Sequence, residues 1–209
     1  PCEARCRRNM IDSSVNIRGL KRMAVDNARA NTVPVPEKAP STGKRIAIAG
    51  GGPGGLSAAY YLELMGHHAV VFEQKSQLGG MLRYGIPNYR FPRERLDEDI
   101  EAILSTGVEV HTGVNIGNGE NDISLSRLRE DFDAVYIAIG AHNDKKIGIE
   151  GEDAEGVISA VEMLRNIGDN NPPDFTGKTV LVVGGGNVAM DCTRSAIRLG
   201  AKKVGIAYR

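Results

Sequence analysis

The sequence lacks an excess of charge of either sign. Its 26 basic residues balance 26 acidic ones over 209 residues, and only three cysteines are present. A chain without net charge has no electrostatic reason to bind nucleic acid or an anionic membrane surface. Three cysteines do not make a disulfide framework at this length. We therefore expect no nucleic-acid partner and a reducing, cytoplasmic location.

Long apolar runs are also missing. No run approaches the roughly 18 residues of a membrane-spanning helix, and no secretory signal is visible. The sequence shows no Ser/His/Asp triad and no zinc-binding pattern. Glycine, with 26 residues, is then the most informative residue type.

Glycines cluster in the segment from Lys44 to Gly80. Residues 45–49 predict a buried strand, a helix is expected from about Leu56 to Met65, and residues 69–73 predict a second strand. Between the first strand and the helix the sequence reads GGGPGG, which contains G-x-G-x-x-G. This order of strand, turn, helix and strand is typical of a dinucleotide site.

Each glycine of that turn has a physical task. Gly50 permits the tight turn, Gly52 lets the backbone approach a pyrophosphate, and Gly55 lets the helix pack closely on the strand. Glu73, at the end of the second strand, would accept hydrogen bonds from ribose hydroxyls and repel a 2′-phosphate. The ligand is therefore predicted to be FAD or NAD; a glycine-rich turn that binds nothing is the alternative.

The same pattern recurs near the end of the sequence. Residues 179–183 predict a strand, residues 184–189 read G-x-G-x-x-A, residues 190–199 predict a helix and residues 203–208 another strand. This copy ends at Arg209 where the first ends in an acid. An arginine at that edge favours a 2′-phosphate and hence NADP(H), with NAD(H) left open.

Glycines and aromatic residues follow the first acid. The pair Gly79–Gly80 would let backbone wrap close to a planar ligand. The side chains of Tyr84, Tyr89 and Phe91 would either shield a ring system or pack in the core. Helices are expected at 93–105 and 124–130, with a strand at 109–111.

An apolar run at 133–140 predicts a strand buried on both faces of a parallel sheet. Gly140 and Ala141 then fall at the carboxyl edge, where ligands bind in open α/β sheets. Within 151–168, the apolar spacing of Val157, Ile158, Val161 and Leu164 predicts a helix.

The first 30 residues are polar and basic. Cys2 and Cys6 are four apart, which would place them on one helical face, and residues 16–29 predict an amphipathic helix. Thiolates at this spacing would ligate a metal or an iron–sulfur cluster, or they are free thiols. Further along, Cys192 is expected to be a buried thiol, and Asp191 to pair with Arg194 in a surface or cap interaction.

The fold class predicted from these patterns is α/β, with two Rossmann-like units in tandem after a short helical segment that contains cysteines. The expected division is a cysteine-containing segment at 1–30, a linker at 31–43, a nucleotide-binding domain at 44–176 and the start of a second one at 177–209. The resemblance described next implies partial iron–sulfur binding for 1–30, FAD for 44–176 and NAD(P) for 177–209. Both ends look cut, so we expect a piece of a longer polypeptide.

Four phrases carry a resemblance that covers essentially all of residues 1–209: PCEARCRR, GGMLRYGIPNYRFP, DAVYIAIGAH and GGGNVAMDCTRSAIRLGAKKV. They closely resemble the small subunit of NADPH-dependent glutamate synthase. The same module occurs in the large subunit of electron-bifurcating ferredoxin–NADP oxidoreductase and in the N-terminal half of dihydropyrimidine dehydrogenase.

The resemblance implies three sets of cofactor-binding residues. The first would hold FAD: Gly50, Gly52, Pro53, Gly54, Gly55, Glu73, Gly80, Leu82, Gly85, Ile86, Gly140 and Ala141. The second would hold NADP(H) or NAD(H): Gly184, Gly186, Asn187, Val188 and Arg209. The third, Cys2 and Cys6, would be two ligands of a [4Fe-4S] cluster, although the earlier cysteines of the family pattern are absent from this sequence.

The function that the resemblance implies is a flavoprotein oxidoreductase module, in which electrons pass from NAD(P)H to FAD, then to iron–sulfur clusters and a partner subunit. The cofactors carry this chemistry, and no catalytic acid or base is expected from the chain. One alternative is a structural, electron-wiring subunit without nicotinamide turnover of its own. Another is an FAD enzyme without clusters.

Overall fold

The computed structural model describes residues 2–28 and 34–208. The chain forms two compact units, Pro1–Pro36 and Glu37–Arg209. Among the described residues, no helix is both long and apolar enough to cross a membrane.

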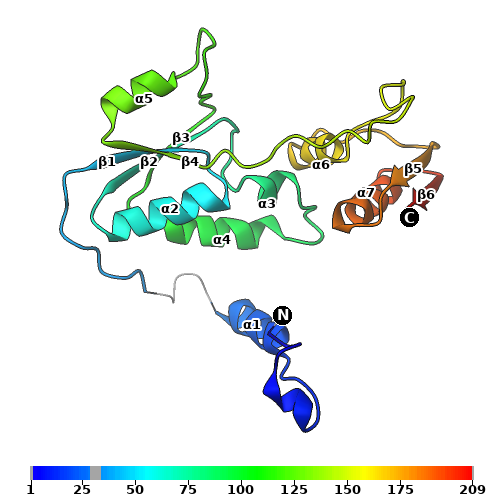
Figure 1. Cartoon of the computed structure of the whole chain (residues 1–209), viewed down its shortest axis with the longest axis horizontal. Helices are drawn as coiled ribbons and strands as arrows, with labels where there is room; N and C mark the ends of the chain where they lie inside the picture. Colours follow the sequence, from blue (N-terminus) through cyan, green and yellow to red (C-terminus); the bar gives the residue numbers. More distant parts are fainter. Residues whose placement is uncertain (1, 29–33, 209) are drawn as a thin grey trace. The chain divides into compact units, whose positions relative to one another are not determined.

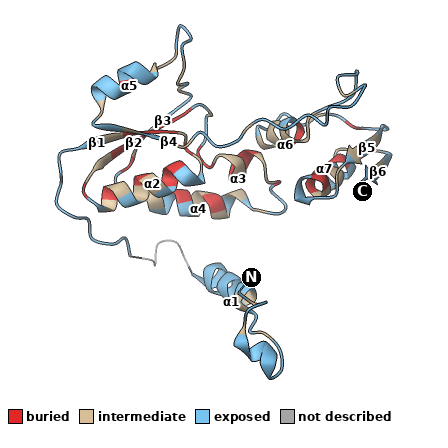
Figure 2. Cartoon of the chain, viewed as in Figure 1, coloured by how far each residue is buried: buried red, intermediate tan, exposed pale blue. Residues whose placement is uncertain are grey.

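The N-terminal unit consists of a short 3-10 helix, η1 (Arg7–Met10), and helix α1 (Ile17–Asn27). Asn16 caps α1 by accepting a hydrogen bond from the backbone N–H of Gly19 at 3.0 Å. Neither helix has a buried residue, as the pale blue of α1 in Figure 2 shows. The predicted amphipathic helix is confirmed, and Leu20 and Met23 of its apolar face are 52% and 59% exposed.

The expected common helical face for the two N-terminal cysteines is wrong. Residues 2–5 form a turn, and Cys6 has an extended backbone, with φ −65° and ψ 122°, as the cap of η1. The backbone N–H of Cys6 donates to Glu3 O at 3.1 Å. Because this turn replaces a helix between the two residues, their sequence spacing alone does not set their geometry.

The second unit begins with a four-stranded parallel sheet in the order β3-β2-β1-β4. Helices α2 and α4 lie on one side of this sheet and α5 on the other (Figure 1). The α/β class with a parallel sheet is thereby confirmed. The strands are β1 (Arg45–Ala49), β2 (His68–Glu73), β3 (Glu109–Thr112) and β4 (Ala134–Ile137), and the helices are α2 (Pro53–Leu64), α3 (Met81–Tyr84), α4 (Arg93–Leu104) and α5 (Leu125–Asp131).

The inner strands bury both faces because successive side chains of a strand point to opposite sides. Ile48 and Val71 pack into the core under α2 and α4, whereas Ala47 and Val70 pack into the core under α5. All four are at most 1% exposed. This double burial explains why β1 and β2 read as continuous apolar runs.

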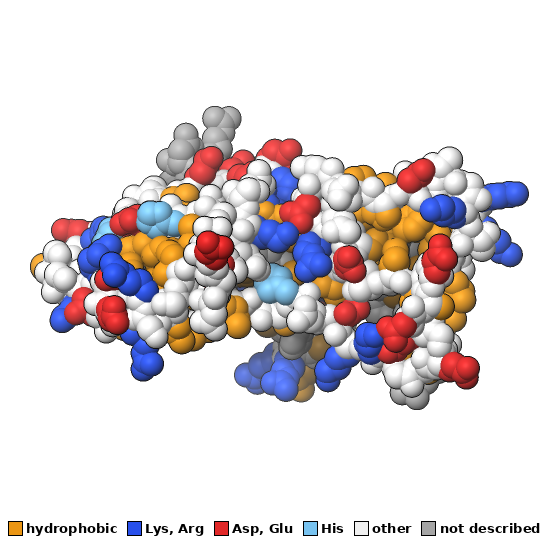
Figure 3. All heavy atoms as spheres, turned by 90° about the horizontal axis from the view of Figure 1, so that it is seen from above, with side chains coloured by type: hydrophobic (Ala, Val, Ile, Leu, Met, Phe, Trp, Pro, Cys, Tyr) orange, Lys and Arg blue, Asp and Glu red, His pale blue; other side chains and the backbone are white. Residues whose placement is uncertain are grey.

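Strand β4 does not show the predicted burial on both faces. Tyr136 is 47% exposed, Ile137 59% and Ile139 64%, although the run is as apolar as that of β1. The strand is the last of the sheet, beyond the strands that α2 contacts, and only Val135 packs beneath α5. Figure 3 shows hydrophobic side chains open to solvent between charged ones on one face of the molecule.

A second sheet of two parallel strands, β5 (Thr179–Val183) and β6 (Lys203–Ala207), carries the second glycine turn. Helices α6 (Ala160–Gly168) and α7 (Asn187–Arg198) pack with it around a small core. The members of this core include Met163, Leu164, Phe175, Cys192 and Ala196.

Helix α6 is shorter than the apolar spacing predicts. Val157 and Ile158 lie before it, at 56% and 52% exposure. Ser159 caps the helix by accepting from the N–H of Glu162 at 3.2 Å. The cap fixes the start of α6 one residue later and leaves the two preceding apolar side chains in solvent.

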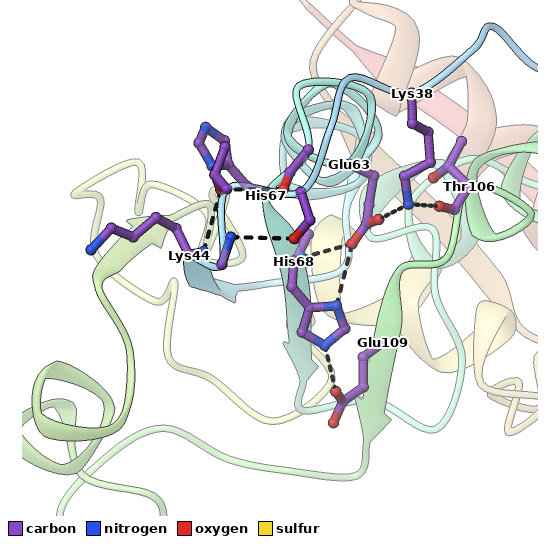
Figure 4. A network of polar contacts seen from close by, with 12 residues as sticks. Lys38, Lys44, Glu63, His67, His68, Thr106 and Glu109 are labelled. Carbon is purple, nitrogen blue, oxygen red and sulfur yellow. Dashed lines mark hydrogen bonds and ion pairs between the residues drawn. The ribbon is translucent and has the colours of Figure 1, made fainter.

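A polar network ties the segment after Pro36 to the amino ends of the strands (Figure 4). Glu63 of α2 accepts from Lys38 and from the backbone N–H of Ala69, the latter at 2.8 Å. The Lys38 ammonium also donates to the carbonyl of Thr106 at 2.6 Å. The side chain of Glu63 is only 3% exposed, so its charge depends on these partners.

The network continues along the strand starts. His68 Nε2 lies 2.9 Å from Glu109 Oε2, and His111 Nε2 lies 2.7 Å from the other oxygen of the same carboxylate. Hydrogen bonds from His68 and His111 hold the pKa of Glu109 below its usual value. Residues 37–43 belong to the expected linker at 31–43. Through Lys38 they are bonded to Glu63 and Thr106 of the sheet domain.

We expect Glu63→Gln to lower the free energy of unfolding by about 2 kcal/mol, because it leaves the Lys38 ammonium beside an amide instead of a carboxylate. Urea denaturation of the wild type and the variant measures the difference. The matched control is Glu101→Gln, at an exposed position of α4, which should change the free energy by less than about 0.5 kcal/mol. Equal changes in the free energy of unfolding for both variants would contradict a stabilising role for the Glu63 carboxylate.

Candidate functional site

The first glycine turn is held by contacts that leave no room for side chains. Gly50 has φ +112°, and its N–H donates to Phe72 O at 2.8 Å. A Cβ at Gly50 would lie 2.4 Å from Ala138 O, and one at Gly55 would lie 1.9 Å from Gly50 O. The turn therefore brings α2 down onto β1 in the way the glycine spacing predicts.

The first turn of α2 presents backbone to solvent. Gly52 is the N-cap and has no side-chain cap, Pro53 occupies the start of the helix, and a Cβ at Gly54 would meet no atom within 4 Å. The helix begins at Pro53, three residues before the predicted start. Free N–H groups at a helix N-terminus together with an open approach are what a diphosphate requires.

Glu73 lies against this turn and is only 6% exposed. Its Oε2 accepts from the N–H of Gly51 at 2.7 Å and its Oε1 accepts from the N–H of Lys75 at 2.8 Å. A carboxylate has about four lone-pair positions, so two remain for ribose hydroxyls. The acid therefore fits a ribose and also braces the turn.

A second glycine pair closes onto the first turn. The N–H of Gly79 donates to Gly51 O at 2.8 Å. Gly80 has φ +52°, and a Cβ there would lie 2.7 Å from Gly52 Cα. Two backbone segments from different parts of the chain thus meet without an intervening side chain, as the pairing of glycines predicts.

Residues 81–92, which comprise α3 and the irregular segment after it, are held together by Arg93, which sequence reasoning missed. We call them the Arg93-held loop. The Arg93 guanidinium donates to the carbonyl oxygens of Leu82 at 3.0 Å and Ile86 at 2.6 Å, and also to those of Arg83 and Phe91. Burial, with Arg83 nearby, holds the pKa of Arg93 below its usual value. The available signal was a cation at the first residue of α4, where the helix dipole disfavours it.

The aromatic residues of this loop have partners within the protein. Tyr84 is 4% exposed and its hydroxyl donates to Gln77 O at 3.2 Å. Phe91 packs against the core under α2 and α4, and Tyr89 contacts α7. Of the two interpretations left open by the sequence, packing is the one these contacts support.

The carboxyl edge of β4 reaches the same turn. The N–H of Ala138 donates to Ala49 O at 2.8 Å, which places the backbone of Ala138 and Ile139 against Gly50. Gly140, with φ +68°, and Ala141 follow directly. The structure thus brings three predicted segments together, the Gly50–Gly55 turn, the Gly79–Gly80 pair and the end of β4.

The second glycine turn repeats the geometry of the first. Gly184 has φ +125° and its N–H donates to Ala207 O at 2.8 Å, as that of Gly50 does to Phe72 O. Gly186 caps α7 with φ −82° and ψ −177°, against −80° and −177° for Gly52. Asn187 and Val188 form the first turn of α7, which has no side-chain cap at Gly186.

The residue opposite Glu73 in the second turn is Tyr208, not Arg209 as the sequence comparison predicted. The hydrogen bonds of the two turns align Phe72 with Ala207, so that Glu73 corresponds to the residue after Ala207. A Cβ at Gly185 would lie 3.3 Å from the ring of Tyr208, where the first turn has Glu73 beside Gly51. Arg209 itself lies outside the described residues.

The expected pairing of Asp191 with Arg194 is also wrong. Asp191 is 4% exposed, and its Oδ2 lies 2.7 Å from Arg90 Nη1, a residue of the loop that Arg93 organises. Its Oδ1 is buried without a hydrogen-bond partner among the described residues. The side chain of Asp191 therefore faces the segment before α4, where Arg90 lies, and not the surface.

The cysteines differ sharply in environment. Burial raises the pKa of Cys192 to about 11, and this residue is a core thiol as predicted. Backbone amides of Val15, Arg8 and Asn9 hold the pKa of Cys6 below its usual value, which favours a thiolate. Within residues 2–28 and 34–208, no three His, Cys, Asp or Glu side chains are placed to hold a metal ion.

Comparison with known proteins gives a consistent picture. The family described as pyridine nucleotide-disulphide oxidoreductase matches residues 44–209. The beta subunit of the NADP(+)-dependent formate dehydrogenase of Moorella thermoacetica is 41% identical in an alignment of 233 positions that covers 100% of this chain and 32% of that protein. The glutamate synthase [NADPH] small chain of Bacillus subtilis is 36% identical, over 98% of this chain and 43% of that protein.

Among solved structures, that of Mycobacterium tuberculosis FprA in complex with NADPH has a TM-score of 0.67 and 24% identity, over 80% of this chain and 43% of that one. This similarity supports the fold. The relationship to glutamate synthase small chains that the motifs indicated is confirmed. The chain spans between about a third and a half of the length of these proteins, with 32% of the formate dehydrogenase subunit at the lower end.

We expect Gly55→Ala to lower the free energy of unfolding by about 1–3 kcal/mol, because the added methyl must push α2 away from Gly50 O. Gly54→Ala is the matched control in the same helical turn. It adds a methyl into open space and should change the free energy by no more than about 1 kcal/mol, in the stabilising direction. Urea denaturation compares the two; equal destabilisation would contradict the close contact at Gly55.

Proposed function

The chain belongs to the pyridine nucleotide-disulphide oxidoreductase family, and from this premise we propose that it is an NADPH-dependent, FAD-containing electron-transfer module of a larger redox enzyme. NADPH would give two electrons as a hydride to the flavin, and the electrons would leave through iron–sulfur clusters to a partner subunit. The observation that carries the proposal is the first glycine turn, where helix α2, Glu73 and Gly80 surround an open backbone surface.

FAD is the ligand that we assign to this turn. The diphosphate would bind at Gly50, Gly52, Pro53, Gly54 and Gly55, and Glu73 would accept hydrogen bonds from the adenosine ribose. Gly80, Leu82, Gly85 and Ile86 would lie along the flavin, with Gly140 and Ala141 beside them. Arg93 supports this assignment because it fixes the carbonyls of Leu82 and Ile86, and therefore the loop on which these residues lie.

The nicotinamide nucleotide would bind at the second turn, at Gly184, Gly186, Asn187 and Val188. Its geometry matches that of the first turn, and we therefore propose two Rossmann-like units in tandem, the first built on β1–β4 and the second on β5 and β6. The position of Glu73 is taken by Tyr208, so no carboxylate repels a 2′-phosphate there. Arg209 would then pair with that phosphate, which favours NADP(H) over NAD(H).

The N-terminal unit would supply two ligands, Cys2 and Cys6, to a [4Fe-4S] cluster. The N–H groups directed at Cys6 support this assignment, because hydrogen bonds to the sulfur stabilise a thiolate. Four thiolates are needed, and the only other cysteine of this sequence is the buried Cys192. The remaining ligands would have to come from outside residues 1–209, so no electron-transfer step is assigned to this unit by itself.

The work of this chain is then binding, orientation and exclusion of water rather than proton transfer. The glycine turns set the positions of the two diphosphates, and the Arg93-held loop sets the wall against the flavin. The hydride step needs no side chain of the described site as an acid or base, because the hydride carries its proton with the two electrons. When the electrons leave for the clusters, that proton would be released from the flavin to water. The names of the relatives, an NADP(+)-dependent formate dehydrogenase subunit and an NADPH glutamate synthase chain, support partner subunits for this protein.

The proposal is tested on the native protein that carries this chain, purified and kept anaerobic. We expect bound FAD, iron and acid-labile sulfide on analysis, and bleaching of the flavin absorbance when NADPH is added. A flavin that stays oxidised with both NADPH and NADH, but is reduced by dithionite, would favour the wiring subunit without nicotinamide turnover. Flavin reduction without iron or sulfide would favour the enzyme without clusters.

We expect Arg209→Glu to raise the dissociation constant for NADPH about 10- to 100-fold, the equivalent of one lost charge-assisted hydrogen bond, and to leave that for NADH nearly unchanged. Titration of the flavoprotein that has first been reduced with dithionite, so that neither nucleotide transfers a hydride, measures both constants. Lys203→Glu makes the same charge change at the other end of β6 and should affect neither. Equal loss of NADPH and NADH binding in Arg209→Glu would contradict a 2′-phosphate contact.

A further inference from the structure

Within residues 37–209, β1–β4 with α2–α5 form what we call the first unit, and β5 and β6 with α6 and α7 form the second unit. The covalent connection between these two units does not fix their arrangement. Residues 139–159, between β4 and α6, form no helix or strand, and their apolar side chains are open to solvent. Ile147, for example, is 61% exposed and Ile149 58%. A segment with so few buried contacts does not hold two domains at a set orientation. The orientation must come from contacts between the units themselves.

One loop of the first unit contacts α7 through two neighbouring residues. Arg90 forms an ion pair with Asp191 at 2.7 Å, and the Tyr89 hydroxyl donates to the backbone oxygen of Asp191 at 3.2 Å. The guanidinium carbon of Arg198 lies 4.1 Å from the centre of the Tyr89 ring. We call the set Tyr89, Arg90, Asp191 and Arg198 the clasp. Its α7 members are seven residues apart and so lie on one face of that helix.

Asp191 is buried, but its charge is balanced by a residue outside its own unit. Its side chain is 6% exposed, one oxygen is held by Arg90 and the other has no partner among the described residues. A buried carboxylate is costly unless a charge compensates it. Among the described residues, the cation paired with it is Arg90 of the first unit, so the stability of this helix face depends on the neighbouring unit.

The residues of the clasp belong to the two segments that carry the proposed flavin and nicotinamide contacts. On one side, Arg90 belongs to the loop whose carbonyls Arg93 holds, the loop that carries Leu82 and Ile86. On the other side, α7 begins at Asn187, immediately after the second glycine turn. A rotation of α7 about this contact would move the N-terminus of α7 relative to the loop.

A second contact supports the same arrangement. Lys75, two residues after Glu73, pairs with Asp169 at the end of α6 at 2.8 Å. A Cβ at Gly168 would lie 2.8 Å from Tyr84 Cα, so α6 and α3 meet backbone to backbone. Helix α6 in turn packs on α7, as Figure 1 shows. These contacts fix α6, and the clasp fixes the rotation of α7.

We propose that Arg90 and Asp191 are positioning residues for hydride transfer, which set the helix that receives the nicotinamide nucleotide at a fixed orientation to the loop that faces the flavin. The inference rests on the proposed function for its chemical consequence, but its geometry is independent of it. Neither residue touches the reacting atoms. Their loss should therefore slow the transfer step and leave the binding of each nucleotide close to that of the wild type.

The test uses Arg90→Gln, Asp191→Asn and the double variant in the native protein. At saturating NADPH, the rate of flavin reduction should fall about 100-fold in each, the effect of a small misplacement of reacting groups, with little change in the dissociation constant for NADPH. The double variant should be no slower than the single ones, because both remove one interaction. Asp131→Asn, which removes the exposed Arg127–Asp131 pair of α5, is the matched control and should change nothing.

Hydrogen exchange of the same variants gives a readout that does not depend on activity. Residues 88–91 and 187–198 should exchange faster in both single variants, and those of β1 and β2 should not. A raised NADPH dissociation constant with an unchanged limiting rate, additive losses in the double variant, or unaltered exchange would each overturn the proposal. If neither nucleotide reduces the wild-type flavin, the proposed function fails, and exchange alone decides whether the clasp holds α7.

Discussion

The contact on which the structure depends is the one between the backbone at Gly50 and the helix turn at Gly55. A Cβ at Gly55 would lie 1.9 Å from Gly50 O, so only glycine lets α2 start where it does. The position of α2 then determines where Gly79 and Gly80 close on the turn and where the following loop begins. Through Tyr89 and Arg90 that loop reaches α7. The arrangement of the second unit is therefore linked to a packing constraint in the first.

Local pattern was sufficient for the elements and for both glycine turns. The predicted bounds of the strands at 45–49 and 179–183 agree with the structure, because a short apolar run between polar residues and a glycine turn leaves little choice. The contacts between distant residues were not predictable in this way. Arg90 and Asp191 are 101 positions apart, and nothing in the sequence near Asp191 distinguishes Arg90 from Arg194 as its partner. The nearer arginine was the natural choice, and it was wrong.

The burial of a strand depends on which helices cover the two faces of its sheet. An apolar run in the sequence does not show whether both faces are covered. Strands β1 and β4 have similar composition, but helices lie on both sides of β1 and the side chains of Tyr136 and Ile137 in β4 remain exposed. The same holds for β5, where Val180 and Val182 pack into a core and Leu181 and Val183 are 66% and 62% exposed. The apolar runs thus predicted where the strands lie, but they did not predict which of the strand side chains are buried.

The difference between the two turns is as informative as their similarity. In the first, Glu73 accepts from the N–H of Gly51 and so stabilises the turn before any ligand binds. In the second, Tyr208 occupies that position, is 77% exposed and has its ring beside Gly185, without a carboxylate. A turn without an internal acceptor leaves its N–H groups to the ligand, and a site without a carboxylate tolerates an additional phosphate. The two turns thus share one backbone geometry and differ in the side chain beside their second glycine, and under the proposed assignment this difference lets FAD bind at the first turn and a nucleotide with a 2′-phosphate at the second.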